Sequence, residues 1–233
     1  MKTKMKTNVI GGMILMALIV EGSLSLASAG GHLEDRQSVA ARPESSKPEV
    51  FLIGDSIRIG YCEAVSRELA DVADVRWPKE NCSNSQNILI QLSWWRNLVS
   101  SPRVIQFNSG HWDVSRWDGD EEPITSITEY GRNLRLIVRR LRRNYPGAKL
   151  VFATTTPMNP NGTVGKNFRT TDDIRRYNAK AKEVMASEGV VVNDLFAQTE
   201  HWPSSDFADY CHFTKTANGR LAKIVADFLR KQF

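Results

Sequence analysis

The feature that most constrains the fold is an alternation of short apolar runs with longer helical patterns, which begins at residue 50 and continues to residue 233. Such an alternation is typical of a parallel sheet whose strands are joined by crossover helices. The runs expected to form strands are residues 50–53, 72–77, 104–107, 150–154 and 190–192. The sequence therefore predicts an α/β fold, a three-layer α/β/α sandwich around a five-stranded parallel sheet.

The segments between these runs carry apolar residues at helical spacing. In the first, residues 57–70, Ile57, Tyr61, Val65 and Leu69 share one face. The other predicted helices are a segment capped by Asn84 or Ser85, residues 127–141, residues 174–184 and residues 214–233. Residues 155–171 contain two prolines and an Asn-Gly pair, and they are predicted to form a long loop over one edge of the sheet.

Residues 1–29 have the features of a secretory signal peptide. Three lysines precede an apolar stretch over residues 9–20, and residues 27–29 read Ala-Ser-Ala, a small-residue cleavage site. A membrane-spanning helix is disfavoured because it needs about 20 apolar residues. Residues 30–48 are polar and aperiodic and are predicted to be a flexible leader before a domain over residues 49–233. The expected location is secreted or periplasmic, with no stable membrane anchor.

Three cysteines, Cys62, Cys82 and Cys211, lie in this expected domain. In an oxidising compartment, one disulfide and one free thiol is the simplest arrangement, and the spacing leaves the pairing open. No CxxC motif or Cys/His cluster indicates zinc. The chain is therefore predicted to contain a disulfide and to need no metal.

The formal net charge of +5 is a modest excess, part of which lies in the signal segment. The basic cluster at residues 139–143 lies near the end of a predicted helix, where cations complement the helix dipole. No aromatic residues are interleaved with this cluster, as a nucleic-acid surface would require. No nucleic-acid partner is expected.

The sequence Gly54-Asp55-Ser56 ends the first apolar run and leads into the first helical pattern. The loops at the carboxyl ends of parallel strands are where open α/β proteins bind ligands. Ser56 has two interpretations at such a corner: a helix N-cap, or a nucleophile whose oxygen lies among free backbone N–H groups. The residues that accompany Ser56 must decide between them.

A nucleophilic serine needs a base, and the base needs an orienting acid. Of the four histidines, His212 lies directly ahead of the last predicted helix, and Asp209 precedes it by three residues. At that spacing the carboxylate can turn onto the imidazole nitrogen that faces away from the serine. Ser56, Asp209 and His212 are therefore the candidate catalytic residues.

Gly-Asp-Ser after the first strand, Asn108 at the end of the third strand and Asp-x-x-His before the terminal helix together resemble the GDSL or SGNH hydrolase superfamily. The resemblance spans residues 50–233 and implies a flavodoxin-like fold and an esterase or lipase activity. It also implies that Ser56 is the nucleophile, that His212 is the general base and that Asp209 orients His212. No cofactor is implied.

The oxyanion region departs from the pattern of that superfamily, which uses a Gly after the second strand and the Asn of a GxND motif after the third. Residues 80–85 contain no Gly, and Trp112 stands where GxND would place Asn. We expect Asn108 to substitute as an amide donor, with Asn81 or Asn84 and the backbone around Cys82 as other donors.

The expected substrates are small-acyl esters, most simply acetyl esters, on carbohydrates. His111, Trp112 and Trp117 follow the third strand, where they can stack on a sugar ring or simply pack in the core. Two alternatives stay open: a lipase or lysophospholipase-type esterase, although no amphipathic lid rich in Leu and Phe is seen, and an inactive relative that binds glycans. A phosphate-binding turn at residues 54–60 is disfavoured because the GxxxxGK[ST] pattern is absent.

Overall fold

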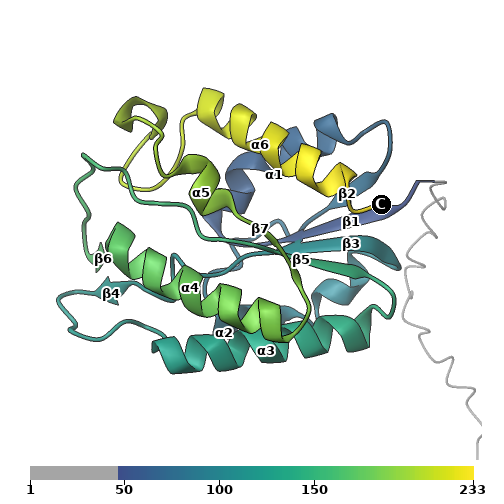
Figure 1. Cartoon of the computed structure of the whole chain (residues 1–233), viewed down its shortest axis with the longest axis horizontal. Coiled ribbons are helices and arrows are strands. Elements are labelled where there is room, and N and C mark those ends of the chain that lie inside the picture. The colour runs from purple at the N-terminus through teal and green to yellow at the C-terminus, as the bar shows by residue number, and fades with distance from the viewer. Residues whose placement is uncertain (1–46) are drawn as a thin grey trace, which may run out of the picture. The chain divides into compact units, whose positions relative to one another are not determined.

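Five parallel strands form the central sheet of the computed structural model, which describes residues 47–233. These are β1 (Glu49–Ile53), β2 (Asp74–Arg76), β3 (Pro102–Phe107), β5 (Lys149–Ala153) and β7 (Val191–Asn193), in the order β2-β1-β3-β5-β7 (Figure 1). Counted within the sheet this is the order 2-1-3-4-5, which is flavodoxin-like. The predicted fold class is confirmed. The predicted signal peptide and residues 30–46 lie outside the described residues.

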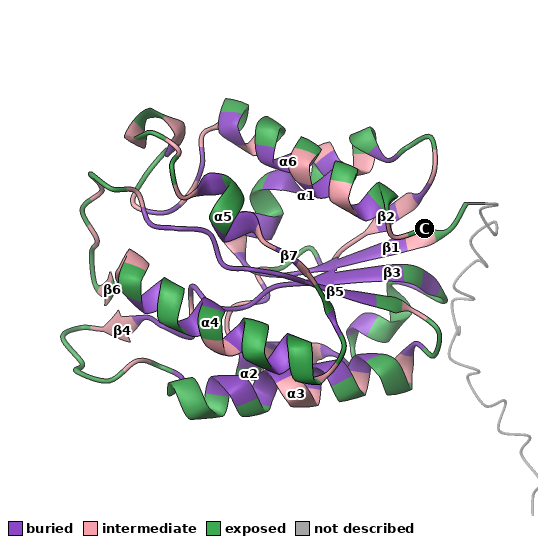
Figure 2. Cartoon of the chain, viewed as in Figure 1, coloured by how far each residue is buried: buried purple, intermediate pink, exposed green. Residues whose placement is uncertain are grey.

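Side chains of the strands alternate between the two faces of the sheet. In β1, Phe51 and Ile53 belong to one hydrophobic cluster, and Val50 and Leu52 belong to the other. All four are buried because helices cover both faces (Figure 2). This explains why the strand reads as a continuous apolar run.

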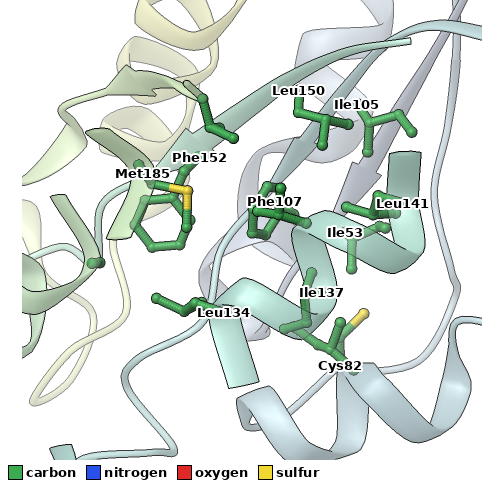
Figure 3. Packing of buried hydrophobic residues seen from close by; sticks show 14 of the residues in the cluster. Ile53, Cys82, Ile105, Phe107, Leu134, Ile137, Leu141, Leu150, Phe152 and Met185 are labelled. Atoms are coloured by element: carbon green, nitrogen blue, oxygen red, sulfur yellow. The ribbon is translucent and has the colours of Figure 1, made fainter. Parts of the chain in front are cut away.

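The first cluster lies beneath α2 (Ser85–Gln91), α3 (Ile127–Asn144) and α4 (Thr171–Ser187). Figure 3 shows its central packing, in which Phe107 and Phe152 of neighbouring strands contact each other edge to face, with ring centroids 5.4 Å apart. The predicted helix at residues 174–184 begins earlier than expected, because Thr170 and Asp173 form a reciprocal capping box.

The second cluster lies beneath α1 (Ser56–Glu68) and α6 (Lys215–Arg230), which pack against each other on the opposite face (Figure 1). Val65 of α1 and Leu221 and Val225 of α6 supply aliphatic side chains to this cluster, and all three are fully buried. The packing of α6 on α1 brings the start of the last helix close to the start of the first. The short helix α5 (Leu195–Thr199) contributes Leu195 to this cluster.

The predicted loop at residues 155–171 contains a short strand that the sequence did not predict. Strand β6 (Asn167–Phe168) pairs antiparallel with β4 (Arg116–Trp117), so that the segments after β3 and β5 form a two-stranded ribbon. Two-residue strands are too short for an alternating pattern to be visible in the sequence. Among residues 47–233, no helix has the length and apolar character that crossing a bilayer requires.

Candidate active site

Ser56 is the first residue of α1 and directly follows the corner at the end of β1. The N-cap of this helix is Asp55, whose Oδ1 accepts the N–H of Ile57 at 3.0 Å. The N-cap interpretation of Ser56 is therefore wrong, because the neighbouring carboxylate already fills that position. The Ser56 hydroxyl is left free for another partner.

That partner is His212, whose Nε2 lies 2.7 Å from Ser56 Oγ. On the other side of the ring, Nδ1 lies 2.7 Å from Asp209 Oδ2. An ionised carboxylate can only accept, so the proton of the neutral ring resides on Nδ1 and Nε2 can accept from the serine. The structure thus brings together the three residues that the sequence selected, in the geometry that a nucleophile, base and acid require.

The turn at residues 209–212 is arranged around the Asp209 carboxylate. Its Oδ1 accepts the backbone N–H groups of Cys211 and His212, both at 2.8 Å. Partial burial raises the pKa of Asp209, but these two N–H groups and the His212 ring outweigh it, and the pKa is lowered overall. The carboxylate is therefore ionised at neutral pH and can stabilise an imidazolium.

Asn108, the predicted amide donor, is buried at the carboxyl end of β3, beside the corner that carries Ser56. Its backbone N–H donates to Ile53 O at 3.0 Å, and its Oδ1 has no hydrogen-bond partner among the described residues. Gly54 leaves the space that the Asn108 side chain occupies, because a Cβ there would collide with Oδ1. Asn108 thus lies at the switch point between β1 and β3, where flavodoxin-like folds bind ligands.

Asn81 and Asn84 have local roles in the segment after β2. Asn81 Oδ1 accepts the N–H of Ser83, and Asn84 Oδ1 caps α2 by accepting the N–H of Asn87, both at 2.9 Å. Neither side chain forms a hydrogen bond to Ser56 or His212 in the part of the chain that the structure describes. Ser83 has a φ of 56°, a left-handed conformation that glycine adopts more readily.

The segment after β2 is attached to the Ser56 corner by Arg58, a residue that the sequence did not single out. The guanidinium is 1% exposed and donates to Gly54 O at 3.0 Å, Pro78 O at 2.9 Å and Glu80 O at 2.6 Å. A charged residue inside a helical pattern is normally expected at the surface. The backbone carbonyls that surround Arg58 in the fold, together with the Cys82 thiol, account for its burial.

Asp113 connects α2 to the loop after β3. It is fully buried and accepts from the backbone N–H and the hydroxyl of Ser85, at 3.0 Å and 2.5 Å, and from the hydroxyl of Ser109. Burial raises the pKa of Asp113, while these donors favour its charged form. This network holds the Gly110–Asp113 turn in place after β3.

His111 is enclosed rather than open to a substrate. Its ring is 2% exposed, and Arg169 Nε donates to its Nδ1 at 3.2 Å, while Nε2 lies 3.3 Å from Thr156 Oγ1. Burial and the Arg169 cation lower the pKa of His111 well below its ordinary value, so the ring is neutral. The expectation that His111 stacks on a sugar is corrected, because protein covers the ring.

Trp112 is half-buried, unlike the adjacent His111, which is buried. It stacks on Trp117 of β4, with ring centroids 5.9 Å apart and an interplanar angle of 28°. Trp112 follows β3, and Trp117 belongs to β4 of the ribbon. Neither ring is fully buried, so the pair keeps part of an aromatic surface exposed.

The three cysteines are free and buried, so the predicted disulfide is wrong. Their surroundings differ: Cys62 Sγ contacts Ile59 O, Cys82 Sγ contacts the Arg58 guanidinium, and Cys211 Sγ contacts the Arg169 guanidinium. Burial raises the pKa of Cys82 to about 11 and that of Cys211 to about 12. Cysteine spacing alone carried no information on these separate environments.

Asp209, Cys211 and His212 place one possible metal ligand each within 4.8 Å of one another. Two observations disfavour a cation there. Arg169 Nη2 lies 3.4 Å from Cys211 Sγ, so a positive charge already adjoins the thiol, and His212 Nδ1 is paired with Asp209. The cluster is better explained by the hydrogen bonds that it makes within the turn.

The model of the GDSL-like lipase/acylhydrolase family matches residues 52–220. The comparison of the sequence with curated proteins gave no match. Among solved structures, a lipase/acylhydrolase from Enterococcus faecalis is similar with a TM-score of 0.62 and 18% identity, over 79% of this chain and 96% of that one.

Two further solved structures are similar at comparable levels. A GDSL-like lipase from Bacteroides thetaiotaomicron has a TM-score of 0.63 and 14% identity, over 83% of this chain and 93% of that one. An acetyl xylan esterase has a TM-score of 0.61 and 14% identity, over 78% of this chain and 99% of that one. At these identities the structural likeness concerns the fold.

Proposed function

Because the chain belongs to the GDSL-like lipase/acylhydrolase family, whose chemistry is the hydrolysis of ester bonds, we propose that Ser56, His212 and Asp209 form the catalytic triad of a secreted serine esterase. The observation that carries the proposal is the pair of 2.7 Å contacts that join Ser56 Oγ to His212 Nε2 and His212 Nδ1 to Asp209 Oδ2. The packing of the sheet and helices does not depend on these two contacts, so a catalytic role explains them better.

In the proposed mechanism, Ser56 Oγ attacks the ester carbonyl while His212 Nε2 takes its proton. Asp209, ionised and hydrogen-bonded to Nδ1, stabilises the imidazolium. The imidazolium then gives its proton to the departing alcohol, which leaves an acyl group on Ser56. Water attacks this acyl-enzyme with His212 again as base, and the carboxylic acid is released. No step requires a cofactor.

The negative oxygen of each tetrahedral intermediate needs donors that are already in place. The first turn of α1 offers backbone N–H groups at the positive end of the helix dipole, and Ser56 is its first residue. We assign Asn108 as the amide donor, since it follows the neighbouring strand β3; its side chain also hydrogen-bonds Asp55, the N-cap of α1. Asn81 and Asn84 are less suited because their side-chain oxygens anchor a turn and a helix cap.

The substrates we propose are small-acyl esters, most simply acetyl esters, on carbohydrates. The stacked and half-buried Trp112–Trp117 pair supports a sugar ring as the alcohol portion, because aromatic faces suit such rings. One structural neighbour is an acetyl xylan esterase, which supports this substrate class by analogy of fold only. The secretory signal proposed for residues 1–29 would bring the enzyme to extracellular polysaccharides.

A lipase-type esterase is the second candidate function. It is favoured by two exposed apolar side chains near the end of α2, Ile90 (60% exposed) and Trp94 (71% exposed), which could contact a lipid surface. Two structural neighbours are lipases by name. An inactive relative that binds glycans is the third, and the 2.7 Å Ser56–His212 contact speaks against it.

The test compares the chain lacking residues 1–29 with its Ser56→Ala variant. p-Nitrophenyl acetate should be hydrolysed by the first and not by the second, and equal rates would remove the esterase proposal. Acetate release from acetylated polysaccharides, measured beside fatty-acid release from a lysophospholipid, separates the two candidate substrates. Faster turnover of the lysophospholipid would replace the carbohydrate proposal by the lipase-type one.

A further inference from the structure

Ser56 and the Asp209–His212 pair of the proposed triad are anchored in the fold in different ways. Ser56 is attached to β1 and α1, whose residues on either side of it are buried, whereas Asp209 and His212 lie in a partly exposed turn, in which Cys211 is the buried residue. The side chains of Asp209 and His212 are 44% and 37% exposed. The distance of 2.7 Å between His212 Nε2 and Ser56 Oγ therefore depends on the hydrogen bonds that hold the turn as well as on the packing of its buried residues.

The ends of the turn are anchored by aromatic residues. Phe207 and Phe213 pair across its base, are both buried, and have ring centroids 4.8 Å apart. A backbone hydrogen bond from Ala208 N to His212 O at 2.7 Å closes the turn above them. These contacts define the shape of the turn but do not define where Asp209 and Tyr210 lie relative to the rest of the molecule.

The segment between β5 and α4 supplies that missing support. Asn159 donates twice to the turn: its backbone N–H bonds to Tyr210 O at 2.9 Å, and its Nδ2 bonds to Asp209 O at 3.0 Å. Asn167 Nδ2 bonds to the Tyr210 hydroxyl at 3.0 Å. The backbone of both central residues of the turn is thus held by one asparagine of a neighbouring loop.

Arg169 holds the same turn by contacting the side chains of Tyr210 and Cys211. Its Nη2 donates to Cys211 Sγ at 3.4 Å, and its guanidinium lies over the Tyr210 ring, 5.2 Å from the centroid. The other two nitrogens of the guanidinium also donate: Nε to His111 Nδ1 and Nη1 to Asn167 O. Within residues 47–233 Arg169 forms no ion pair with a carboxylate, so its planar fork of donors accounts for its burial.

Gly162 shows how closely the loop and the turn approach. A Cβ on this glycine would lie 2.8 Å from the Cα of Tyr210, a backbone atom that cannot move aside without moving the turn. Gly165, three residues later in the same loop, has no atom within 4 Å of the corresponding position. The two glycines therefore form a natural pair of test and control positions.

We propose that residues 154–170 form a cradle that sets the position of the Asp209–His212 pair against Ser56, with Asn159, Gly162 and Arg169 as positioning residues. This inference rests on the proposed triad and adds the elements that align it. None of the three residues touches the reacting atoms; each acts through the backbone, the ring or the thiol of residues 209–211. Displacing the cradle should leave substrate binding nearly intact and slow the chemical step.

The experiment compares Gly162→Ala with Gly165→Ala in p-nitrophenyl acetate hydrolysis. Gly162→Ala should lower kcat about 10- to 100-fold with KM nearly unchanged, since a displacement of about 1 Å can cost as much as about 100-fold. Gly165→Ala should match the wild type. Asn159→Ala removes the side-chain bond to Asp209 O, together with the bonds that Asn159 Oδ1 accepts from Ser204 Oγ and Asn161 N. It should lower kcat in the same way, which keeps the test decisive if Gly162→Ala does not fold.

A second readout is independent of activity. The proton between His212 Nδ1 and Asp209 should give a far-downfield NMR signal, assigned by its loss in His212→Gln. We expect this signal to shift or broaden in Gly162→Ala and to stay in place in Gly165→Ala. Wild-type kcat and an unmoved signal in both Gly162→Ala and Asn159→Ala would overturn the cradle. An active Ser56→Ala variant would instead overturn the proposed function, whatever the cradle variants show.

Discussion

The Nε2 atom of His212 lies 2.7 Å from the Oγ atom of Ser56, although 156 positions separate the two residues in the chain. The contact follows from the topology. Ser56 opens α1, His212 lies just before α6, and these two helices pack side by side on one face of the sheet (Figure 1). The proposed chemistry therefore depends on the packing of the last helix against the first.

Asp209→Asn should lower kcat for p-nitrophenyl acetate by about 10³- to 10⁴-fold with little change in KM. The amide can present Nδ2 to His212 Nδ1, which favours the tautomer whose Nε2 carries the proton and cannot accept from Ser56. The matched control is Asp172→Asn, since the Asp172 side chain is 86% exposed on α4. An Asp209→Asn enzyme within tenfold of the wild type would show that Asp209 does not orient the base.

The stability of the fold should fall as the pH drops below about 6.5, and His111 should be one cause. Its folded-state pKa lies well below the ordinary value of 6.5, because it is buried and faces the Arg169 cation, with His212 also nearby. Below pH 6.5 the unfolded chain binds a proton at this position that the folded chain does not, so the free energy of unfolding decreases by up to about 1.4 kcal/mol per pH unit.

The measurement is urea unfolding of wild type and His111→Gln at pH 7.5, 6.5 and 5.5. The variant removes the titrating group, so its stability should depend less on pH across this range, even if it is less stable throughout. His201→Gln is the control, because the His201 side chain is 88% exposed. Parallel pH dependences for wild type and His111→Gln would contradict the assignment.

The sheet could be predicted because strands that are buried on both faces have continuous apolar sequences. Val50–Ile53 is the clearest example, and the neighbouring strand β3 and the strand beyond it, β5, read the same way. The Asp209–His212 pair could be predicted because both residues lie in one turn, where a spacing of three residues defines their geometry. These features are local, and local patterns are visible in a single sequence.

The parts that escaped prediction depend on contacts between distant segments. Arg58 and Arg169 are buried because backbone carbonyls, a thiol and an imidazole from other parts of the chain meet their donors. His111 follows β3, and nothing in its sequence context indicates that Arg169 and Thr156 enclose it. The β4–β6 ribbon likewise forms only when two loops meet.

Asp113→Ala should destabilise the fold by about 3 kcal/mol or more, because it leaves the buried donors of Ser85 and Ser109 without an acceptor. Asp118→Asn should change the free energy of unfolding by less than about 0.5 kcal/mol, since the Asp118 side chain is 70% exposed and asparagine tolerates its left-handed backbone, with a φ of 48°. Urea unfolding of both variants at pH 7.5 measures the difference. Equal stabilities would mean that the Asp113 network does not hold the turn after β3.

The three thiols should be inaccessible in the folded protein and all present in the unfolded one. Thiolates are the reactive form, and burial raises the pKa of each thiol, to about 11 for Cys82 and about 12 for Cys211. At pH 8, a disulfide reagent such as Ellman's reagent should therefore react slowly with the native chain. It should react with three thiols per chain in denaturant without any reductant.

Protein exported to an oxidising compartment is the appropriate sample, because the disulfide inferred from cysteine count would form there if anywhere. Release of one thiol instead of three in denaturant would show that a pair had closed, and would contradict the buried free state. Cys62→Ser, Cys82→Ser and Cys211→Ser would then identify the pair, since replacing a bonded cysteine frees its partner and raises the thiol count, whereas replacing the unbonded one removes the last thiol. A count of three, with unfolding unchanged by reductant, establishes that hydrogen bonds and packing alone hold the three segments together.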